Sequence, residues 1–356
     1  MTVNSRVHEG KLAIVTGSAR GIGAYIARHL AARGANILVN YATESSDGYA
    51  AKLCTELEEK HSVKAVPCRA DISKIESCDY LISVCKQHFG GEMLKISIIV
   101  HNAAVLYLGP VEAVRQDEFD HIYRVNVLGP ALLTGACKPY LPTDRSGRIV
   151  MMSSINPKIG TPHTTLYAGT KASIEAMARV WCRELAENCT VNTINPGPVM
   201  TDMYMTAPDE IKQQLGLWNP LTPLVPVRDS DTPEVQELGR KFGGRAAYPE
   251  EIADLVCMIC SPESGWMTGS LVQDTIHEAS VPGCQSIPHV VASHATLTGD
   301  SFGEEAAVNG QSDARHIRRC GRNTEPPHQF GRGIATATVS FSFITIGTSL
   351  ITIRVF

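Results

Sequence analysis

A short apolar segment, a glycine-rich turn and a helical segment follow one another near the start of this chain. Residues 12–17, LAIVTG, are typical of a buried strand, and residues 23–34, GAYIARHLAARG, have the apolar spacing of a helix. Glycines between the two permit a tight turn. A strand that runs through such a turn into a helix is the first half of a β-α-β unit, so this order of segments predicts a parallel sheet.

The same alternation continues as far as residue 260. We predict further strands at 35–41, 63–71, 97–104, 147–154 and 189–197, and long helices at 116–141, 167–185 and 249–260. Nearly continuous apolar strands are typical of a parallel sheet that is covered on both faces. The sequence therefore predicts an α/β fold, a Rossmann-type doubly wound parallel sheet of about seven strands with helices on both faces, as a single domain with an irregular C-terminal tail.

Composition narrows the partners and the compartment. The 356 residues are 44% hydrophobic and 19% charged, with a formal net charge of −4. That balance of charges does not indicate electrostatic binding to nucleic acid or to an anionic membrane. Eleven scattered cysteines without metal-finger spacing, and an amino terminus without a signal-peptide pattern, favour the reduced cytoplasm and predict no metal site. Cys257 and Cys260 form a CxxC pair at the far end of a helix, where we expect two buried core thiols rather than a redox motif.

Two segments interrupt the regular pattern. Residues 200–247 are too long for a plain connection and contain Met203, Tyr204, Met205, Leu217 and Trp218. We interpret them as a substrate lid within a domain at 1–278. The alternative is a flexible surface loop of the same length.

Residues 279–356 contain no Lys, Met, Trp or Tyr, and we predict a low-order extension there. Its last part, 333–353, is uncharged, which suits a membrane anchor, yet eight of its residues are Ser or Thr and it alternates like a strand. We therefore expect no membrane contact and favour an unstructured or aggregation-prone appendage, or the product of a misread gene model, over the anchor.

The glycine turn, TGSARGIG at 16–23, predicts nucleotide binding. Gly17 permits the tight turn, Gly21 lets the backbone approach a pyrophosphate, and Gly23 allows the helix to pack closely on the strand. The helix N-terminus then offers free N–H groups and a positive dipole to phosphates.

The end of the second strand separates the two nicotinamide cofactors. NAD-binding domains usually place there an acid that binds the ribose hydroxyls. Here Asn40 and Tyr41 occupy that place, and Arg20 in the glycine turn is able to pair with a 2′-phosphate. We therefore expect NADPH rather than NADH, while Glu44 leaves a carboxylate close by in sequence.

Tyr167 and Lys171 are one helical turn apart in LYAGTK. On a helix, both side chains would lie on the same face. This spacing suits a phenol whose pKa is tuned by an ammonium group, and it suits an ordinary surface pair equally well.

Taken with the glycine turn, this pair makes the chain resemble the short-chain dehydrogenases/reductases over roughly residues 8–275. The motifs that carry the resemblance are Thr-Gly-x-x-x-Gly-x-Gly at 16–23, RADI, HNAA, RVNV, a serine thirteen residues before the tyrosine, Tyr-x-x-x-Lys and NPGPVMTDM. The resemblance implies that Asn126, Ser154, Tyr167 and Lys171 are catalytic. It implies that the cofactor is bound by Gly17, Arg20, Gly21, Ile22, Gly23, Asn40, Tyr41, Asp71, Asn102, Ala103, Tyr167, Lys171, Pro196, Gly197, Val199 and Thr201.

The function that this resemblance implies is hydride transfer between NADPH/NADP+ and a small-molecule carbonyl or alcohol substrate. Tyr167 would donate the proton, Lys171 would lower its pKa and hold the nicotinamide ribose, Ser154 would bind the carbonyl oxygen, and Asn126 would hold a water of the proton relay. VNYATESS and PGPVMTDMY are most similar to fungal NADPH-dependent ketoreductases of the naphthol-reductase type, which implies an aromatic or polyketide-type substrate in secondary metabolism. A homotetramer or dimer is implied as well.

Two rival functions stay open at this point. The length of the chain suits the extended branch of the superfamily, which contains epimerases and dehydratases, but the glycines of that branch are spaced differently. The second rival is a nucleotide-binding protein without catalytic activity, which would not need the intact set of Ser154, Tyr167 and Lys171. The chain also departs from the family at His101 and Ala104 in HNAA, and after residue 270, where GSLVQDTIHEAS replaces the usual Asp-Gly-Gly-like turn.

Overall fold

A computed structural model describes residues 6–219, 222–273, 344–346 and 349–351 of the chain. The chain divides into two compact units, Met1–Val291 and Ala292–Phe356. In the second unit, the described residues are two short antiparallel strands, β8 (Ile344–Ile346) and β9 (Ser349–Ile351). Most of the predicted C-terminal extension, 279–356, lies outside the described residues, and the domain boundary at 278 stays a prediction.

The first unit is built on a seven-stranded sheet in which every pairing is parallel, in the order β3-β2-β1-β4-β5-β6-β7. The strands are β1 (Leu12–Val15), β2 (Asn36–Tyr41), β3 (Ala65–Arg69), β4 (Ile96–His101), β5 (Gly147–Met152), β6 (Cys189–Asn195) and β7 (Leu271–Gln273). The order reverses direction at β1, which has β2 on one side and β4 on the other. The predicted fold class is confirmed.

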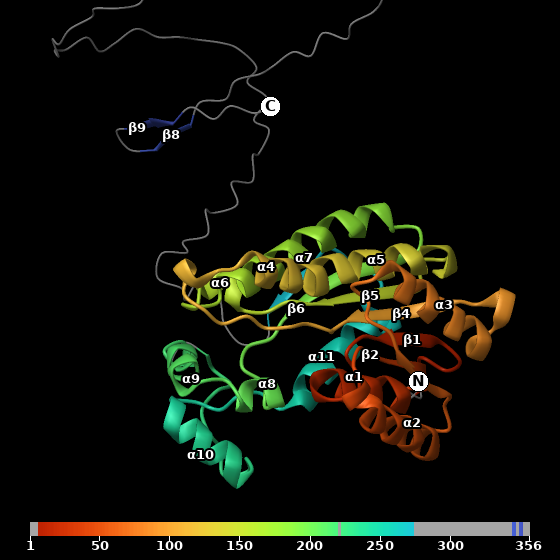
Figure 1. The fold of residues 1–356 in the computed structure, drawn as a ribbon, viewed down its shortest axis with the longest axis horizontal. Helices are drawn as coiled ribbons and strands as arrows, with labels where there is room; N and C mark the ends of the chain where they lie inside the picture. Colours follow the sequence, from red (N-terminus) through yellow and green to blue (C-terminus); the bar gives the residue numbers. More distant parts are fainter. Residues whose placement is uncertain (1–5, 220–221, 274–343, 347–348, 352–356) are drawn as a thin grey trace, which may run out of the picture. The chain divides into compact units, whose positions relative to one another are not determined.

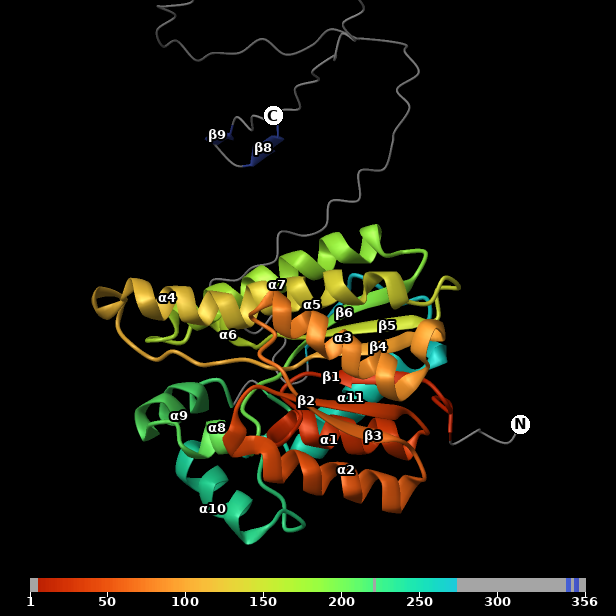
Figure 2. The same cartoon turned by 45° about the vertical axis from the view of Figure 1, so that its right-hand side comes forward.

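Helices cover both faces of this sheet (Figures 1 and 2). One face carries α1 (Gly21–Ala32), α2 (Asp47–His61) and α11 (Pro249–Cys260). The other carries α3 (Ile75–Phe89), α4 (Gln116–Tyr123), α5 (Gly129–Cys137) and α7 (Thr165–Glu184). Each face closes a separate apolar core, because the buried strands present apolar side chains in both directions.

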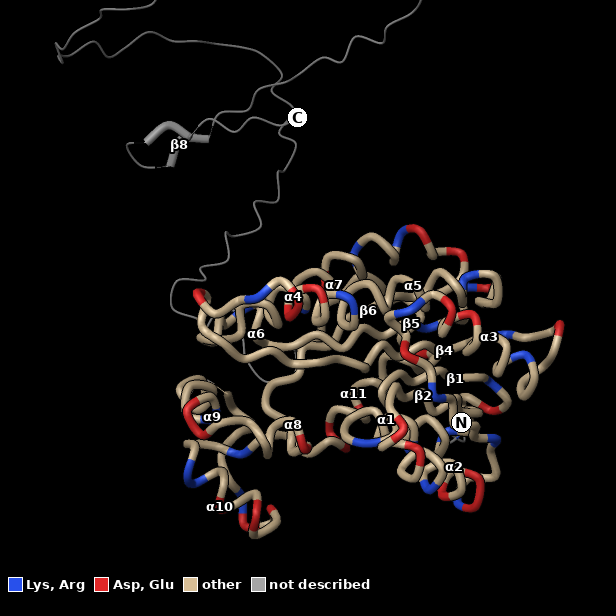
Figure 3. Tube along the Cα trace, in the orientation of Figure 1, with Lys and Arg blue, Asp and Glu red and all other residues tan. Residues whose placement is uncertain are grey.

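Charged residues of both signs are interspersed along the outer helices, whereas the strands carry very few (Figure 3). Cys257 and Cys260 are buried in the core under α11, as the sequence predicted. Burial raises the pKa of both thiols, that of Cys257 to about 12, so they are unreactive core residues. Among the described residues, no helix is both long enough and apolar enough to cross a membrane.

The helix predicted at 116–141 is continuous but not uniform. Between α4 and α5 the chain forms a π-helical turn, Arg124–Leu128, and after α5 a 3₁₀ turn, Lys138–Tyr140. Single π turns inside helices frequently mark functional positions, and Asn126 lies in the middle of this one.

The described residues of the segment predicted as a lid include three α-helices beyond the carboxyl end of the sheet (Figure 1). These are α8 (Asp202–Met205), α9 (Asp209–Gly216) and α10 (Pro233–Phe242). The two ends of the segment are joined, because Val199 pairs with Ala247 in a parallel bridge and Met200 N donates to the Ala247 carbonyl at 2.9 Å.

Arg245 fastens the returning end of this segment to α11. Its buried guanidinium donates to both carboxylate oxygens of Glu251, at 2.7 and 2.8 Å. Glu251 also accepts from Tyr248 N at 2.8 Å and so completes the N-terminal cap of α11. The hydrogen bonds from Arg245 hold the pKa of Glu251 below its usual value.

We predict that Glu251→Gln destabilises the protein by about 1 to 3 kcal/mol, because charge-assisted hydrogen bonds to a buried arginine are lost. Glu250→Gln is the matched control, since Glu250 is in the same helical turn and exposed. Urea unfolding of both variants measures the difference. A carboxyl with a lowered folded pKa contributes its full stabilisation above its unfolded pKa, so the difference should vanish as the pH falls through the folded pKa. Equal stability of the two variants at neutral pH would contradict this role of Glu251.

Candidate active site

The glycine turn lies in the crevice at the carboxyl ends of β1 and β4, where the strand order reverses. The Thr16 hydroxyl accepts from the backbone N–H groups of Asn102 and Ala103, both at 3.0 Å. Asn102 Nδ2 donates back to the carbonyl oxygens of Thr16 and Gly17, at 2.9 and 3.2 Å. Gly17 has a φ of +62°, and a Cβ there would lie 2.9 Å from Ala103 Cα, so only glycine fits.

The next two glycines differ in what surrounds them. A Cβ on Gly23 would lie 2.5 Å from the Gly17 carbonyl oxygen, so Gly23 allows α1 to pack under the turn. A Cβ on Gly21 would meet nothing nearer than Thr201 Cγ2 at 3.9 Å, so the space in front of Gly21 is open. The first turn of α1 starts there and has no side-chain cap. Open space in front of uncapped backbone N–H groups fits a pyrophosphate.

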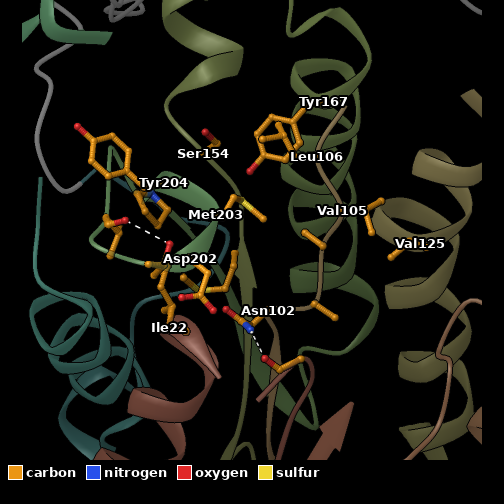
Figure 4. A pocket seen from close by; sticks show the side chains of 18 of the residues that line it. Ile22, Asn102, Val105, Leu106, Val125, Ser154, Tyr167, Asp202, Met203 and Tyr204 are labelled. Atoms are coloured by element: carbon orange, nitrogen blue, oxygen red, sulfur yellow. Dashed lines mark hydrogen bonds between the residues drawn. The ribbon is translucent and has the colours of Figure 1, made fainter. Parts of the chain in front are cut away.

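A cavity of about 990 Å³ begins at this turn and extends to Tyr167. Figure 4 shows Ile22 and Asn102 at one end, and Ser154 and Tyr167 at the other. Most of the predicted site residues line it: Gly17, Arg20, Gly21, Ile22, Asn40, Tyr41, Asp71, Asn102, Ala103, Ser154, Tyr167, Lys171, Pro196, Gly197, Val199 and Thr201. Gly23 and Asn126 lie behind the wall. Among the described residues, no group of side chains is arranged to hold a metal ion.

The end of the cavity beside β2 carries hydroxyl groups, and its one lining carboxylate among the described residues, Asp71, follows β3. Thr43 and Ser46 line it together with Tyr41 and Arg20. Glu44, which the sequence left as a nearby acid, is exposed, lies 3.9 Å from Arg69 and is not part of the wall.

Asn40 and Asp71 both have protein partners at this end. The Asn40 amide donates to the carbonyls of Cys68 and Ala70, so it joins β2 to β3 and leaves its backbone at the cavity. Asp71 Oδ1 accepts from the N–H and the hydroxyl of Ser73, at 3.1 and 2.7 Å. Hydrogen bonds within the protein therefore hold both side chains in place in the cavity wall.

Ser154, Tyr167 and Lys171 meet at the far end of the cavity although they come from two elements. Ser154 follows β5, and the other two lie one turn apart on α7. The Lys171 ammonium lies 5.5 Å from the centroid of the Tyr167 ring and donates to the Met152 carbonyl at 2.6 Å. The Ser154 hydroxyl accepts from Asn156 N at 3.2 Å and hydrogen bonds with Tyr167. The alternative of an ordinary surface pair is wrong, because Lys171 is buried.

The electrostatics of this pair differ from the expectation that Lys171 lowers the pKa of the phenol. Burial raises the pKa of Tyr167 to about 12, and only the hydrogen bond with Ser154 acts in the opposite direction. Burial likewise lowers the pKa of Lys171 to about 8. Desolvation is the main cause of both shifts, and the Lys171 ammonium donates to the Met152 carbonyl.

The Asn126 side chain is fully engaged by the protein. Its Oδ1 accepts from Val105 N at 2.8 Å, and its Nδ2 donates to the Val105 carbonyl at 2.9 Å and to the Thr170 hydroxyl at 3.1 Å. It therefore ties the π turn and α7 to the chain that follows β4. Both amide hydrogens of Asn126 are thus used to hold the loop and the helix in place, whereas Oδ1 keeps one lone pair, and the expected contact with a relay water stays a prediction.

The lid contributes only part of the surface that its sequence suggested. Met203 and Tyr204 line the cavity, joined by Thr206, Pro208, Ile211 and Leu215. Met205, Leu217 and Trp218 are not in the wall, and Leu217 is 76% exposed. Asp202 is the first residue of α8 and also lines the cavity.

Several wall and support residues were not anticipated from the sequence. They are Thr43, Ser46, His121, Asn156, Thr161 and Thr164 in the wall, and Glu175 behind it. Buried Glu175 accepts from the Ser153 hydroxyl at 2.8 Å and from Asn195 Nδ2 at 2.9 Å, next to Ser154 and Pro196. Its position one helical turn after Lys171 was the available signal. His101 is buried and bonded to Thr134 at 2.8 Å, with its pKa lowered by burial to about 3.

Comparison with known proteins identifies the family. The model of the short chain dehydrogenase family matches residues 11–212. An L-xylo-3-hexulose reductase of Hypocrea jecorina is 39% identical over 293 residues, which is 75% of this chain and 96% of the relative. An L-xylulose reductase of Aspergillus niger is 40% identical over 292 residues, 75% and 97% of the two chains. A hydroxynaphthalene reductase-like protein Arp2 of Metarhizium anisopliae is 32% identical over 270 residues, 74% and 92%.

Solved structures with the same fold include complexes with nicotinamide cofactors. A blue fluorescent protein from a metagenomic library in complex with NADPH has a TM-score of 0.63 at 28% identity and covers 74% of this chain and 96% of its own. The angucycline C-6 ketoreductase LanV with bound NADP has a TM-score of 0.62 at 26% identity, with 75% and 94% covered.

This chain belongs to the short-chain dehydrogenase/reductase family. It is an NAD(P)-dependent oxidoreductase that acts on CH–OH or C=O groups, and both the reductase relatives and the NADP-bound structures support carbonyl reduction with NADP. The open cradle at Gly21 and the elongated cavity fit such a cofactor, with its pyrophosphate at the glycine turn and its nicotinamide toward Tyr167.

We predict that Tyr167→Phe lowers kcat at least about a hundredfold, because the substitution removes only the hydroxyl group that we expect to donate the proton. The measurement is NADPH oxidation with whichever ketone the wild type reduces fastest. Binding of NADPH, followed by fluorescence titration, should stay within about twofold of wild type. Turnover of the variant at the wild-type rate would exclude Tyr167 as the acid.

Proposed function

We propose that the protein is an NADPH-dependent reductase of small ketones in which Tyr167 is the general acid. The observation that carries this proposal is the cavity itself, which joins a phosphate-binding turn without an adjacent carboxylate to Ser154, Tyr167 and Lys171. The cofactor, when bound, supplies the hydride that goes to the carbonyl carbon. The chain's own residues bind the carbonyl oxygen and protonate it.

Burial suits Tyr167 to the role of proton donor. A phenol with a pKa of about 12 keeps its proton at neutral pH. As the carbonyl oxygen takes on charge, it becomes a stronger base than the phenolate, so the O–H bond of Tyr167 breaks and the new O–H bond forms on the substrate. The Lys171 ammonium, released from the Met152 carbonyl, stabilises the phenolate that is left.

Ser154 orients the substrate for this transfer. Its Oγ accepts from Asn156 N, and its hydroxyl hydrogen, which bonds with Tyr167 in the protein alone, turns to the carbonyl oxygen when the substrate binds. A donor fixed at the place where negative charge develops stabilises the transition state more than the ground state.

The preference for NADPH over NADH is supported by the groups around the adenosine end. Arg20, Thr43 and Ser46 offer a positive charge and two hydroxyls to a 2′-phosphate, while Glu44 points away from the cavity. A carboxylate in that place would repel the phosphate.

We predict that Arg20→Gln raises the Kd for NADPH about tenfold and leaves that for NADH nearly unchanged, because the guanidinium pairs only with the 2′-phosphate. Arg28→Gln is the matched control, since Arg28 is on α1, the helix that begins directly after Arg20, but pairs with Glu56 at 2.9 Å outside the cavity. Equal losses for the two cofactors would place Arg20 elsewhere in the binding reaction.

The substrate that we propose is a small ketose-type ketone, as the names of the hexulose and xylulose reductases suggest. An aromatic or polyketide-type ketone of fungal secondary metabolism is the second candidate, favoured by the apolar side chains that Met203, Tyr204 and Ile211 bring to the cavity. NADPH oxidation with xylulose, a hydroxylated naphthalenone and simple ketones separates the two. Failure to oxidise NADPH with any of them would refute the proposed reductase. Cytoplasmic location and a role in secondary metabolism stay predictions.

We propose a homodimer or homotetramer formed through α4, α5 and α7. This face exposes Phe119, Leu128 and Val180, at 39, 45 and 52%. Leu128 also borders a shallow groove of about 390 Å³, together with Asp120, Tyr123, Arg124, Val127, Ala131 and Met177. Apolar side chains around a groove are typical of a surface that is covered in an oligomer.

We predict that Leu128→Asp halves the native mass measured by light scattering after size exclusion, because a charge is buried without a partner in the interface. Tyr80→Asp on α3, 54% exposed in the wild type, is the control and should keep the wild-type mass. The same mass for wild type and Leu128→Asp would exclude this face.

A further inference from the structure

The cavity has two chemically different walls near Ser154. Asn156, Thr161 and Thr164 form a polar wall and are only 9, 7 and 3% exposed. The chain between β5 and α7, including the short helix α6 (Asn156–Ile159), provides all three. Other parts of the cavity are apolar, where Leu106, Leu108 and the lid contribute. In Figure 4, Leu106 lies beside Tyr167, and Met203 comes from the lid.

The hydroxyl groups of the polar wall are already used within the protein. Thr164 Oγ1 donates to the Thr161 carbonyl at 2.6 Å. Thr161 Oγ1 donates to Asn156 Oδ1 at 2.9 Å. This chain of hydrogen bonds ends on the amide of Asn156 and fixes its oxygen.

The amide nitrogen of Asn156 is left over. It carries two N–H donors, and no described residue accepts a hydrogen bond from it, although its side chain is nine-tenths buried and lines the cavity. This nitrogen is open to the cavity and is not sealed inside the protein. Its N–H groups are therefore available to an oxygen of a water or of a ligand bound there.

The position of Asn156 relative to Ser154 indicates which oxygen of a substrate the Asn156 side chain could bind. Asn156 N donates to Ser154 Oγ at 3.2 Å, and Ser154 Oγ is the group that holds the reacting carbonyl oxygen in the proposed function. The Asn156 side chain therefore begins next to Ser154 Oγ and lines the same cavity, within reach of a substrate whose carbonyl oxygen is held by Ser154. A substituent on the adjacent carbon is the nearest one it can reach.

We propose that Asn156 is a specificity-determining residue whose Nδ2 donates to a hydroxyl on the carbon next to the reacting carbonyl. This inference rests on the proposed ketone reduction and assigns to one residue the recognition of the α-hydroxyl group, which ketoses and other α-hydroxy ketones carry. A site built to hydrogen bond a substrate hydroxyl discriminates strongly against the analogue without it, because the polar group of the site is then left unpaired.

The test compares two matched pairs of ketones, acetoin with butanone and α-hydroxyacetophenone with acetophenone. A hydroxyl next to a carbonyl also activates the carbonyl electronically, so the preference of the wild type alone is not diagnostic. The informative quantity is the change in the hydroxyketone-to-ketone ratio of kcat/KM on mutation of Asn156. We expect Asn156→Leu, which keeps the volume, to lower this ratio about tenfold in both pairs, through loss of the hydroxyketone rate.

Thr161→Val is the matched control. It removes the same Thr161–Asn156 hydrogen bond from the other side and keeps the amide nitrogen, so it should retain most of the preference. Melting temperature and NADPH affinity show whether each variant is folded, and Asn156→Ser replaces Asn156→Leu if the latter is not. Because Asn156 N holds Ser154, a general disturbance of the site would lower both members of a pair equally.

An unchanged ratio in folded Asn156→Leu or Asn156→Ser would overturn the assignment of Asn156 and leave the reductase proposal intact. An equal loss for hydroxyketone and ketone would also overturn it. Absence of NADPH oxidation by wild type with all four ketones and with the sugar and naphthalenone substrates would instead refute the proposed function on which the assignment rests.

Discussion

The close approach of β1 to the end of β4 determines where everything else in this site lies. The Thr16 hydroxyl binds two backbone N–H groups across the gap, and the Asn102 amide binds two carbonyls in return. Because Gly17 has no Cβ, the strands meet without a side chain between them. The crevice outside the sheet therefore starts at Gly21 and opens toward β5 and β6, the strands whose ends carry the reacting groups.

The reacting end depends on a second buried contact, at Glu175. Its carboxylate joins α7 to Ser153 and Asn195, the residues immediately before Ser154 and Pro196. Three segments that are far apart in the chain are thus aligned by one side chain, while Asn126 ties the loop after β4 to α7. Both groups act through hydrogen bonds with the backbone or with neighbours of the cavity wall, so their part is positioning.

The sequence predicted what depends on local pattern, and it missed what depends on packing between distant segments. Strand and helix alternation predicted the sheet, and fixed spacings located Gly17, Ser154, Tyr167 and Lys171. The inward orientation of Thr43 and the polar wall at Asn156 depend on turns whose direction no periodic pattern encodes. The same holds for the lid, where Met203 faces the cavity and Leu217 faces solvent although both are apolar. Proximity in sequence also suggested a role for Glu44, but the turn after β2 leaves Glu44 outside the cavity wall.

The electrostatics of Tyr167 and Lys171 show most clearly how folding changes a motif. Spacing on a helix suggests that an ammonium lowers the pKa of a neighbouring phenol, but burial acts on both groups and disfavours the charged form of each. The protein alone therefore holds a neutral acid next to a weakened cation. Such a pair keeps its proton until negative charge forms in front of it, which suits an acid that must act late, at the moment when the substrate oxygen becomes basic. The cost of burying the two groups is then recovered in the transition state, where the charge that develops on the substrate is paired with the proton of Tyr167 and, through the phenolate, with Lys171.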